Sequence, residues 1–169
     1  MGSRRKFIAL LLTFPVFLTV IPVCARPDRG DDDIDEKLSY AYILSMENIR
    51  KLGSIQNEVS DLLDKNEQIS NKLEHDKEFE RGSIAVRARA FEIKYPEIGT
   101  IIRKKGMSTR EYVLGMQVLL RALFLVMKKQ KGEIKDYSGA GPGINPANLA
   151  FVEEHLDEIR KSMHFRFRA

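Results

Sequence analysis

A long apolar stretch in the second half of the chain constrains the fold more than any other feature. It begins with Ser108, a favoured helix N-cap, and Glu111 follows three residues later, as in a capping box. Between Glu111 and the closing pair Lys128 and Lys129, apolar side chains occupy most of the circumference of a helix. Because such a helix must be enclosed by others, the sequence predicts a core helix over residues 107–129.

This predicted helix carries one narrow polar line, formed by Gln117, Arg121 and Lys128. An arginine charge that is buried without a partner is costly, so folding alone does not explain the line. We therefore take Gln117, Arg121 and the nearby Tyr112 as candidate ligand-binding residues, suited to a small apolar or anionic ligand. Gly115 in the same helix is expected to permit the close approach of another helix.

The first 25 residues have the three parts of a secretory signal peptide. Basic residues at 4–6 precede an apolar run at 7–21 and small residues up to Ala25, where we expect cleavage. A membrane anchor fits less well, because the run is shorter than roughly 20 residues and contains proline. Lipidation of Cys24 is an alternative, but the residues before it are not small. The sequence thus predicts a periplasmic or secreted protein.

Removal of this segment changes both the charge and the cysteine content. The chain has a net charge of +4, and residues 1–25 hold three of its 28 Lys and Arg but none of its 24 Asp and Glu, which leaves +1. This near balance gives no support to a nucleic-acid partner or an anionic membrane. Because Cys24 is the only cysteine, the 144 mature residues must be held together by packing, without disulfides or a cysteine zinc site.

The mature chain is expected to begin with a flexible acidic leader at residues 26–36, followed by a single helical domain at 37–169. Three alternating aspartates from position 31 onward have the spacing of a calcium loop. Glu36 and Tyr42, however, stand where such a loop needs a glycine and a bidentate glutamate. A solvated acidic segment that leads into a helix is the better interpretation.

The next predicted helix has an apolar seam with spacings of three and four residues. Such a seam favours a partner helix, as in a coiled coil, with Asn66 as the polar residue that sets the register. The alternative is a long amphipathic helix that packs on the rest of its own domain. The interface hypothesis assigns self-association, or binding of an envelope protein, to Leu52, Ile55, Val59, Leu62, Asn66, Ile69 and Leu73.

Proline, glycine and capping residues mark further helix boundaries. Ser83 begins a helix that should end before Pro96, because a residue that precedes proline is pushed out of helical geometry. Pro96 begins a short helix that should end at Gly106. Asn145 and Pro146 are a typical cap and first residue for the last helix.

The remaining segments read as surface. Residues 65–82 are expected to be a charged helix end that passes into a loop. The alternate glycines of residues 137–144 predict a flexible loop and not a phosphate-binding loop. We expect Arg87 on the solvent side of its helix, although its spacing also fits the apolar stripe.

No segment indicates a strand, so we predict an all-α bundle of four or five helices around the central apolar helix.

Two stretches of the C-terminal half carry a recurring pattern. They are Tyr95-Pro96-Glu97 with Gly106-Met107-Ser108-Thr109-Arg110-Glu111-Tyr112-Val113, and Asn145-Pro146-Ala147-Asn148-Leu149-Ala150-Phe151-Val152. In these stretches, and more weakly at residues 42–51, the chain resembles a group of small exported helical proteins of Gram-negative bacteria that has no known activity. The resemblance implies export and a helical fold, and it carries over no activity and no catalytic residue.

No residue pattern indicates catalysis. The three histidines lack a metal-binding spacing, and there is no serine-elbow pattern. We therefore predict an exported helical binding or adaptor module that is not an enzyme and needs no cofactor. The alternative is a carrier that holds a small apolar or anionic ligand in the bundle interior near Arg121. The basic and apolar tail at 164–168 would touch a membrane transiently at most.

Overall fold

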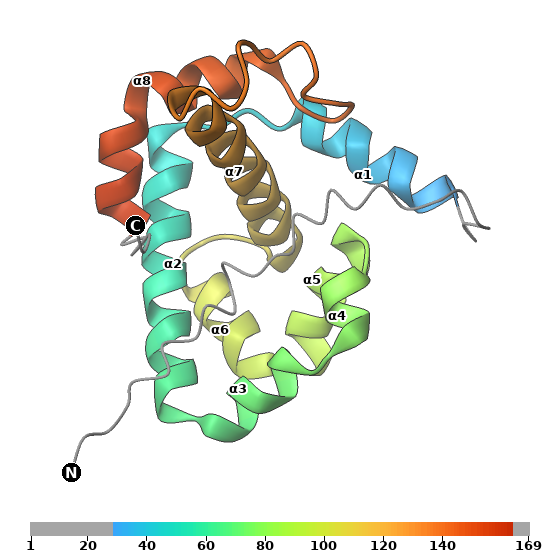
Figure 1. The fold of residues 1–169 in the computed structure, drawn as a ribbon. Helices are drawn as coiled ribbons and strands as arrows, with labels where there is room; N and C mark the ends of the chain where they lie inside the picture. Colours follow the sequence, from blue (N-terminus) through green and yellow to red (C-terminus); the bar gives the residue numbers. More distant parts are fainter. Residues whose placement is uncertain (1–28, 164–169) are drawn as a thin grey trace.

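The computed structural model describes residues 29–163, and the side chains from residue 32 onward. The all-α prediction is confirmed, since this part of the chain folds into eight helices and has no strand (Figure 1). The predicted cleavage site at Ala25 and the tail after residue 163 lie outside the described residues. The helices are α1 (Arg29–Ala41), α2 (Met46–Lys65), α3 (Glu67–Glu74), α4 (Lys77–Arg81), α5 (Ile84–Ile93), α6 (Pro96–Lys104), α7 (Thr109–Gln130) and α8 (Pro146–Met163).

Helix α7 is the centre of the bundle, as the sequence predicts. Its N-cap is Ser108, whose hydroxyl accepts a hydrogen bond of 3.1 Å from the Glu111 backbone N–H. It runs between α2 and α8 on one side and α1 and α5 on the other (Figure 1). Leu119, Leu123 and Val126 are at most 2% exposed in this setting. Each such side chain contributes roughly 1.5–3 kcal/mol to folding, so α7 accounts for much of the core.

Glycines within helices let neighbouring helices approach closely, as two examples show. A Cβ on Gly115 of α7 would lie 3.0 Å from the Tyr42 hydroxyl oxygen and 3.4 Å from the Leu52 side chain of α2. A Cβ on Gly53 of α2 would lie 2.5 Å from the backbone carbonyl oxygen of Ser162 in α8. The close approach expected at Gly115 is therefore present, and a second one joins α2 to α8.

The bundle has more helices than the four or five predicted, because residues 65–82 are not a helix end and a loop, and because the segment at 42–45 separates α1 from α2. Asn66 ends α2, and its side chain accepts a hydrogen bond of 3.1 Å from the Ile69 N–H as the N-cap of α3. Asp76 caps α4 in the same way, through a 3.0 Å bond from the Phe79 N–H. Side-chain caps thus divide the charged segment into two short helices.

The acidic segment also differs from the flexible leader predicted at residues 26–36. From Arg29 onward it belongs to α1, so the helical unit begins before residue 37. Acidic side chains near a helix N-terminus are favoured by the helix dipole. In addition, the Asp35 carboxylate accepts a hydrogen bond of 2.8 Å from the Ile84 N–H of α5, which ties α1 to the bundle.

The segment at 42–45, between α1 and α2, is held by two asparagines at the start of α8. Asn148 is 1% exposed, donates to the Tyr42 carbonyl oxygen at 2.7 Å and accepts from the Leu44 N–H at 2.8 Å. Asn145 donates to the Tyr40 carbonyl oxygen at 2.8 Å. These bonds satisfy backbone groups that have no helical partner, and they fix the position from which α1 projects.

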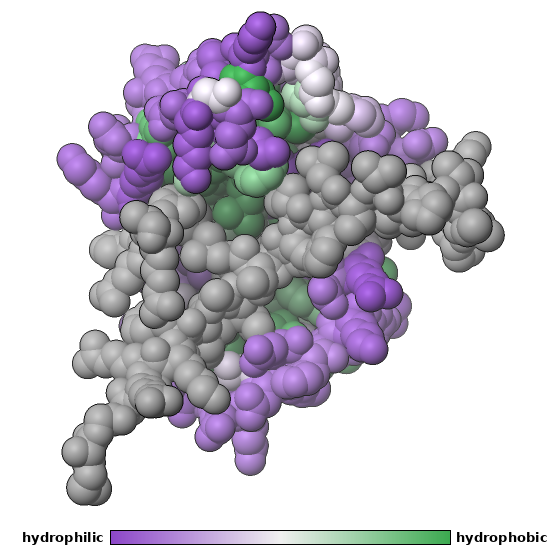
Figure 2. Space-filling view, in the orientation of Figure 1, coloured by the Kyte–Doolittle hydropathy of each residue, from purple (hydrophilic) through white to green (hydrophobic). Residues whose placement is uncertain are grey.

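Hydrophilic residues dominate the described part of the face drawn in Figure 2, and hydrophobic ones show only in smaller areas between them. Among the residues whose side chains the structure describes, four large hydrophobic ones are more than half exposed, namely Ile34, Tyr40, Ile43 and Ile93. The first three belong to α1 or to the segment that follows it. Among the described helices, α1 is therefore less deeply embedded than its neighbours.

Candidate binding cleft

A cleft of about 260 Å³ lies where α1 passes over the start of α5 and the middle of α7. It combines carboxylates of α1 with arginines and an amide of the bundle. We call it the arginine cleft, and it is lined by Asp32, Asp35, Glu36, Arg81, Gly82, Ser83, Arg87, Gln117 and Arg121. Two of the three predicted ligand-binding residues thus lie in one cleft.

The N-terminus of α5 forms one wall of the arginine cleft. Ser83 is the N-cap of α5 and accepts a hydrogen bond of 3.4 Å from the Val86 N–H. The Asp35 carboxylate of α1 accepts a hydrogen bond of 2.8 Å from the N–H of Ile84, the first residue of α5. Free N–H groups and the positive end of the helix dipole make this position attractive to a carboxylate.

Gln117 connects all three walls. Its side-chain carbonyl accepts a hydrogen bond from the Arg87 guanidinium of α5, and its NH₂ group donates to the Ser39 hydroxyl of α1 at 3.3 Å. Ser39 is fully buried and Arg87 is 6% exposed, so these bonds are shielded from water. An amide can donate and accept at once, and Gln117 uses both functions to hold α1 beside α5.

Arg87 provides a charge at the base of the cleft. Burial lowers the pKa of the Arg87 guanidinium, while the negative charge of Asp35 acts in the opposite direction. Because the ordinary pKa of arginine is above about 12, the group stays charged at physiological pH. The cleft therefore has a permanent positive charge that favours an acidic group beside it.

Arg121 lies at the rim, one turn along α7 from Gln117. It is partly buried and donates to the Pro142 carbonyl oxygen at 3.5 Å. Gly143 has a φ of +80°, and a Cβ there would lie 3.2 Å from the Glu36 Cα and 3.4 Å from the Arg121 guanidinium. The absence of a side chain at Gly143 thus allows the loop to close against both α1 and Arg121.

Tyr112, the third predicted ligand-binding residue, does not belong to the cleft. It is 2% exposed in the core and donates a hydrogen bond of 3.2 Å to the Gln56 side-chain carbonyl. Burial raises the pKa of the Tyr112 hydroxyl. The predicted site in the bundle interior is likewise corrected, because Arg121 faces a surface cleft while apolar side chains fill the interior.

The predicted interface seam is packed within the chain itself. Leu52, Ile55, Val59 and Leu73 are at most 7% exposed, and Leu62 and Ile69 pack against the same core. Helix α2 meets α6, α7 and α8, which cover its apolar side. Asn66 lies at the break between α2 and α3 and not inside a continuous seam. The amphipathic alternative therefore describes these residues, and the interface prediction is corrected.

Several cleft residues were missed in the sequence. Arg87 was expected on the solvent side, yet it is buried, and the carboxylates of α1 were assigned to a flexible leader. A signal for Arg87 was present, since Ile84, Arg87, Ala88 and Phe91 have the spacing of one helix face. No comparable signal reveals that Asp35 meets the start of α5, because the two lie 49 positions apart.

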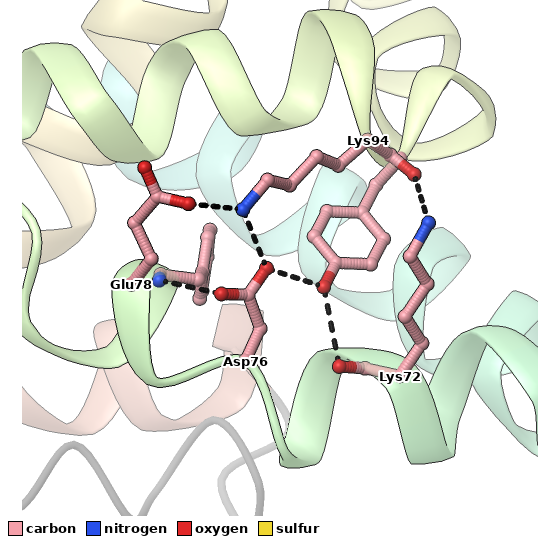
Figure 3. Close-up of polar contacts among 6 residues, drawn as sticks. Lys72, Asp76, Glu78 and Lys94 are labelled. Atoms are coloured by element: carbon pink, nitrogen blue, oxygen red, sulfur yellow. Dashed lines mark hydrogen bonds and ion pairs between the residues drawn. The ribbon is translucent and has the colours of Figure 1, made fainter.

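A second polar cluster, outside the cleft, is centred on Asp76 (Figure 3). One carboxylate oxygen of Asp76 accepts from the Tyr95 hydroxyl at 2.9 Å and lies 3.3 Å from the Lys94 Nζ, while the other accepts from the Phe79 N–H. Lys94 also pairs with Glu78. These bonds fasten α3 and α4 to the turn between α5 and α6. The polar groups of the cluster are hydrogen-bonded to one another. We therefore assign this cluster to stability.

The glycine-rich segment 137–144 borders another depression, of about 360 Å³. Its polar groups are engaged with each other, because the Tyr137 hydroxyl and the Lys129 Nζ lie 2.6 and 2.7 Å from the same Glu153 oxygen. Lys129 also lies 4.6 Å from the centre of the Tyr137 ring. These contacts leave the arginine cleft as the stronger candidate.

Among the helices between residues 29 and 163, none combines the length and hydropathy needed to cross a membrane. Within the same part of the chain, no three His, Cys, Asp or Glu side chains are grouped so that they could hold a metal ion. Comparison of the chain with protein-family models, curated proteins and solved structures finds no match.

Proposed function

We propose that the protein is an exported helical binding module, without a catalytic step, whose arginine cleft binds an acidic segment of a partner protein in the cell envelope. Export is inferred from the signal-peptide pattern of residues 1–25. The site is inferred from the positions of Arg87, Gln117 and Arg121.

One observation carries the proposal: the chain's own acidic helix forms one wall of the cleft, against its arginines. Asp35 binds the start of α5, and Asp32 and Glu36 line the same space opposite three arginines. Without the α1 carboxylates, the lining would keep Arg81, Arg87 and Arg121 and no acidic residue. Guanidinium groups form strong, directional hydrogen bonds with carboxylates, so such a surface suits acidic side chains.

The second candidate is a carrier of a small anionic ligand. It is favoured by the presence of Gln117 and Arg121 in a cleft of about 260 Å³. A small ligand would replace one carboxylate of α1, whereas a protein segment would replace several contacts along the helix. The two candidates therefore differ in how strongly a simple dicarboxylate competes.

The test is a fluorescence-anisotropy titration of the mature chain with a labelled peptide of the sequence of residues 29–41. This peptide is the appropriate probe, because it contains the carboxylates that line the cleft. Arg121→Gln should weaken binding about tenfold, which corresponds to the loss of one charge-assisted hydrogen bond. Arg110→Gln is the matched control, since Arg110 is an exposed arginine of α7 outside the cleft.

Succinate separates the two candidates in the same assay. If the cleft serves acidic protein segments, succinate should displace the peptide only at concentrations on the order of 100 times the peptide Kd. Displacement at concentrations equal to that Kd would support the small-ligand carrier. Equal peptide affinity for wild type and Arg121→Gln would refute the proposed site. The intact mass of the protein from a periplasmic fraction tests export, and it should correspond to a chain that begins at Arg26.

A further inference from the structure

The contacts of α1 define which kind of segment the arginine cleft accepts. Asp35 meets the N-terminus of α5 and Ser39 meets Gln117, at 2.8 and 3.3 Å. These two residues are four positions apart, so they lie on one face of a helix, one above the other. A segment with aspartate and serine in this relation can make both bonds at once.

We infer that α1 is an internal ligand of the α5 and α7 walls of the arginine cleft, and that a partner helix with an Asp-x-x-x-Ser pattern must displace it in order to bind. The inference rests on the proposed function, because it concerns the same cleft. It adds the recognition pattern of the partner and a mechanism that keeps the cleft closed when no partner is present.

The way α1 is attached makes displacement feasible. Two of its three large apolar side chains, Ile34 and Tyr40, are 53% and 52% exposed, so Leu38 is the one that adds partly buried apolar surface to docking. Hydrogen bonds of Asp35 and Ser39 join it to α5 and α7, and a partner helix can supply the same two bonds. Exchange of equivalent bonds costs little free energy, since each broken bond is replaced by a similar one.

The connection to α2 allows α1 to leave without opening the core. The segment at 42–45 is clamped by Asn148, which binds the Tyr42 carbonyl and the Leu44 N–H. Residues after this clamp belong to the packed part of α2, beginning with Ile49, which is fully buried. A rotation of α1 about the residues before the clamp therefore leaves the clamp and α2 in place, and it breaks the bond from Asn145 to the Tyr40 carbonyl.

A covalently linked occupant has a local concentration in the millimolar range, so it competes strongly with a partner added from solution. Weakening the internal contact should therefore strengthen binding in trans. Asp35→Asn is the variant of choice, and Glu36→Gln, on the same face of the cleft, is a second one. Asp33→Asn is the matched control, because it removes one exposed charge from α1 without touching the cleft.

The experiment measures the affinity of the labelled 29–41 peptide for the full mature chain and these variants, each checked for its helical content by circular dichroism. We expect Asp35→Asn to bind the peptide at least about tenfold more tightly than wild type, Glu36→Gln to shift in the same direction, and Asp33→Asn to match wild type. A peptide with alanine in place of Ser39 should bind several-fold more weakly, and one with asparagine in place of Asp35 more weakly still.

The outcomes separate this inference from the proposed function. Equal affinity of wild type and Asp35→Asn, with binding still weakened in Arg121→Gln, would overturn the internal-ligand inference and leave the binding function intact. No peptide binding to any folded variant would overturn both. If the peptide with alanine in place of Ser39 binds as tightly as the unchanged peptide, the Asp-x-x-x-Ser pattern is overturned.

Discussion

Gln117 and Arg121 lie one turn apart on α7, but they have different roles in the cleft. Gln117 is fixed from two sides, by Arg87 and Ser39, in a shielded position. Arg121 has a contact of 3.5 Å with a loop carbonyl, which is at the long end for a hydrogen bond. Arg121 is therefore the group that can change partner at low cost, and Gln117 is the group that positions the walls.

Removal of the Asn148 side-chain amide should lower the free energy of unfolding strongly for so small a change. Asn148→Ala leaves the Leu44 N–H and the Tyr42 carbonyl without their side-chain partner in a buried place. We expect the free energy of unfolding to fall by roughly 2–3 kcal/mol, measured by urea denaturation. Asn71→Ala, on the exposed side of α3, should change stability by less than about 0.5 kcal/mol. Similar losses in the two variants would contradict the clamp.

Asp76 should make stability depend on pH. Burial raises the pKa of its carboxyl, but bonds from the Phe79 N–H, the Tyr95 hydroxyl and Lys94 outweigh burial and hold the pKa below its ordinary value. The stabilisation is therefore complete above the unfolded pKa of about 4 and is lost as the pH falls through the lower folded pKa. Asp76→Asn, which keeps an acceptor for the cap, should cost about 1–2 kcal/mol near pH 7.

The same comparison of Asp76→Asn with wild type, made by urea denaturation at a series of pH values, checks the direction of this effect. The difference in stability should shrink as the pH is lowered below about 4, because the unfolded wild-type chain binds a proton at Asp76 more readily than the folded chain does. A difference that stays constant down to about pH 2 would show that the charge of Asp76 does not contribute. Glu78→Gln, at an exposed partner of Lys94, should have a much smaller effect throughout.

At the scale of helices, the sequence predicted best where one residue type sets a boundary. Pro96 and Pro146 begin α6 and α8, and Gly106 has the positive φ of 73° that commonly follows a helix. Helices α3 and α4 were not predicted, because their caps are polar residues within a charged stretch. Asn66 in particular fits both a seam position and a cap, and only the three-dimensional context separates the two.

Only the cleft residues on α7 were predicted from the sequence, because α7 has a strong apolar pattern of its own. Gln117 and Arg121 stand out because α7 is otherwise apolar. Arg87 and Asp35 do not stand out, since their burial and pairing depend on how α1 crosses α5, which is a contact between distant parts of the chain. Local periodicity contains no information on such a crossing.

The crossing of α2 and α8 gives a prediction at this scale. Gly53→Ala places a Cβ 2.5 Å from the Ser162 carbonyl oxygen, so one helix must shift. We expect a loss of roughly 1–3 kcal/mol in the free energy of unfolding, although alanine is the better helix former by about 1 kcal/mol. Gly139→Ala, at a loop glycine with open space around it, should leave stability unchanged. A stabilised Gly53→Ala variant would contradict the close approach.

For the whole molecule, the bundle interior accounts for the apolar residues that would otherwise indicate a dimer. Ile55 is fully buried beneath the chain's own helices. Ile55→Ala should therefore lower stability by roughly 2–4 kcal/mol, by the same amount at every protein concentration. Asp61→Ala, exposed on α2, is the control. If α2 formed a dimer seam, the thermal midpoint of the wild type would instead rise with protein concentration.

The central claim is that the arginine cleft receives an acidic helix. The most direct measurement is a two-dimensional NMR titration of the Asp35→Asn chain with the 29–41 peptide. We predict saturable shifts of the Ile84 backbone amide and the Gln117 side-chain NH₂, the two donors that α1 binds in the folded chain, with no shift of the exposed Ile93 amide. Saturable shifts elsewhere on the bundle, with Ile84 and Gln117 unchanged, would contradict the claim.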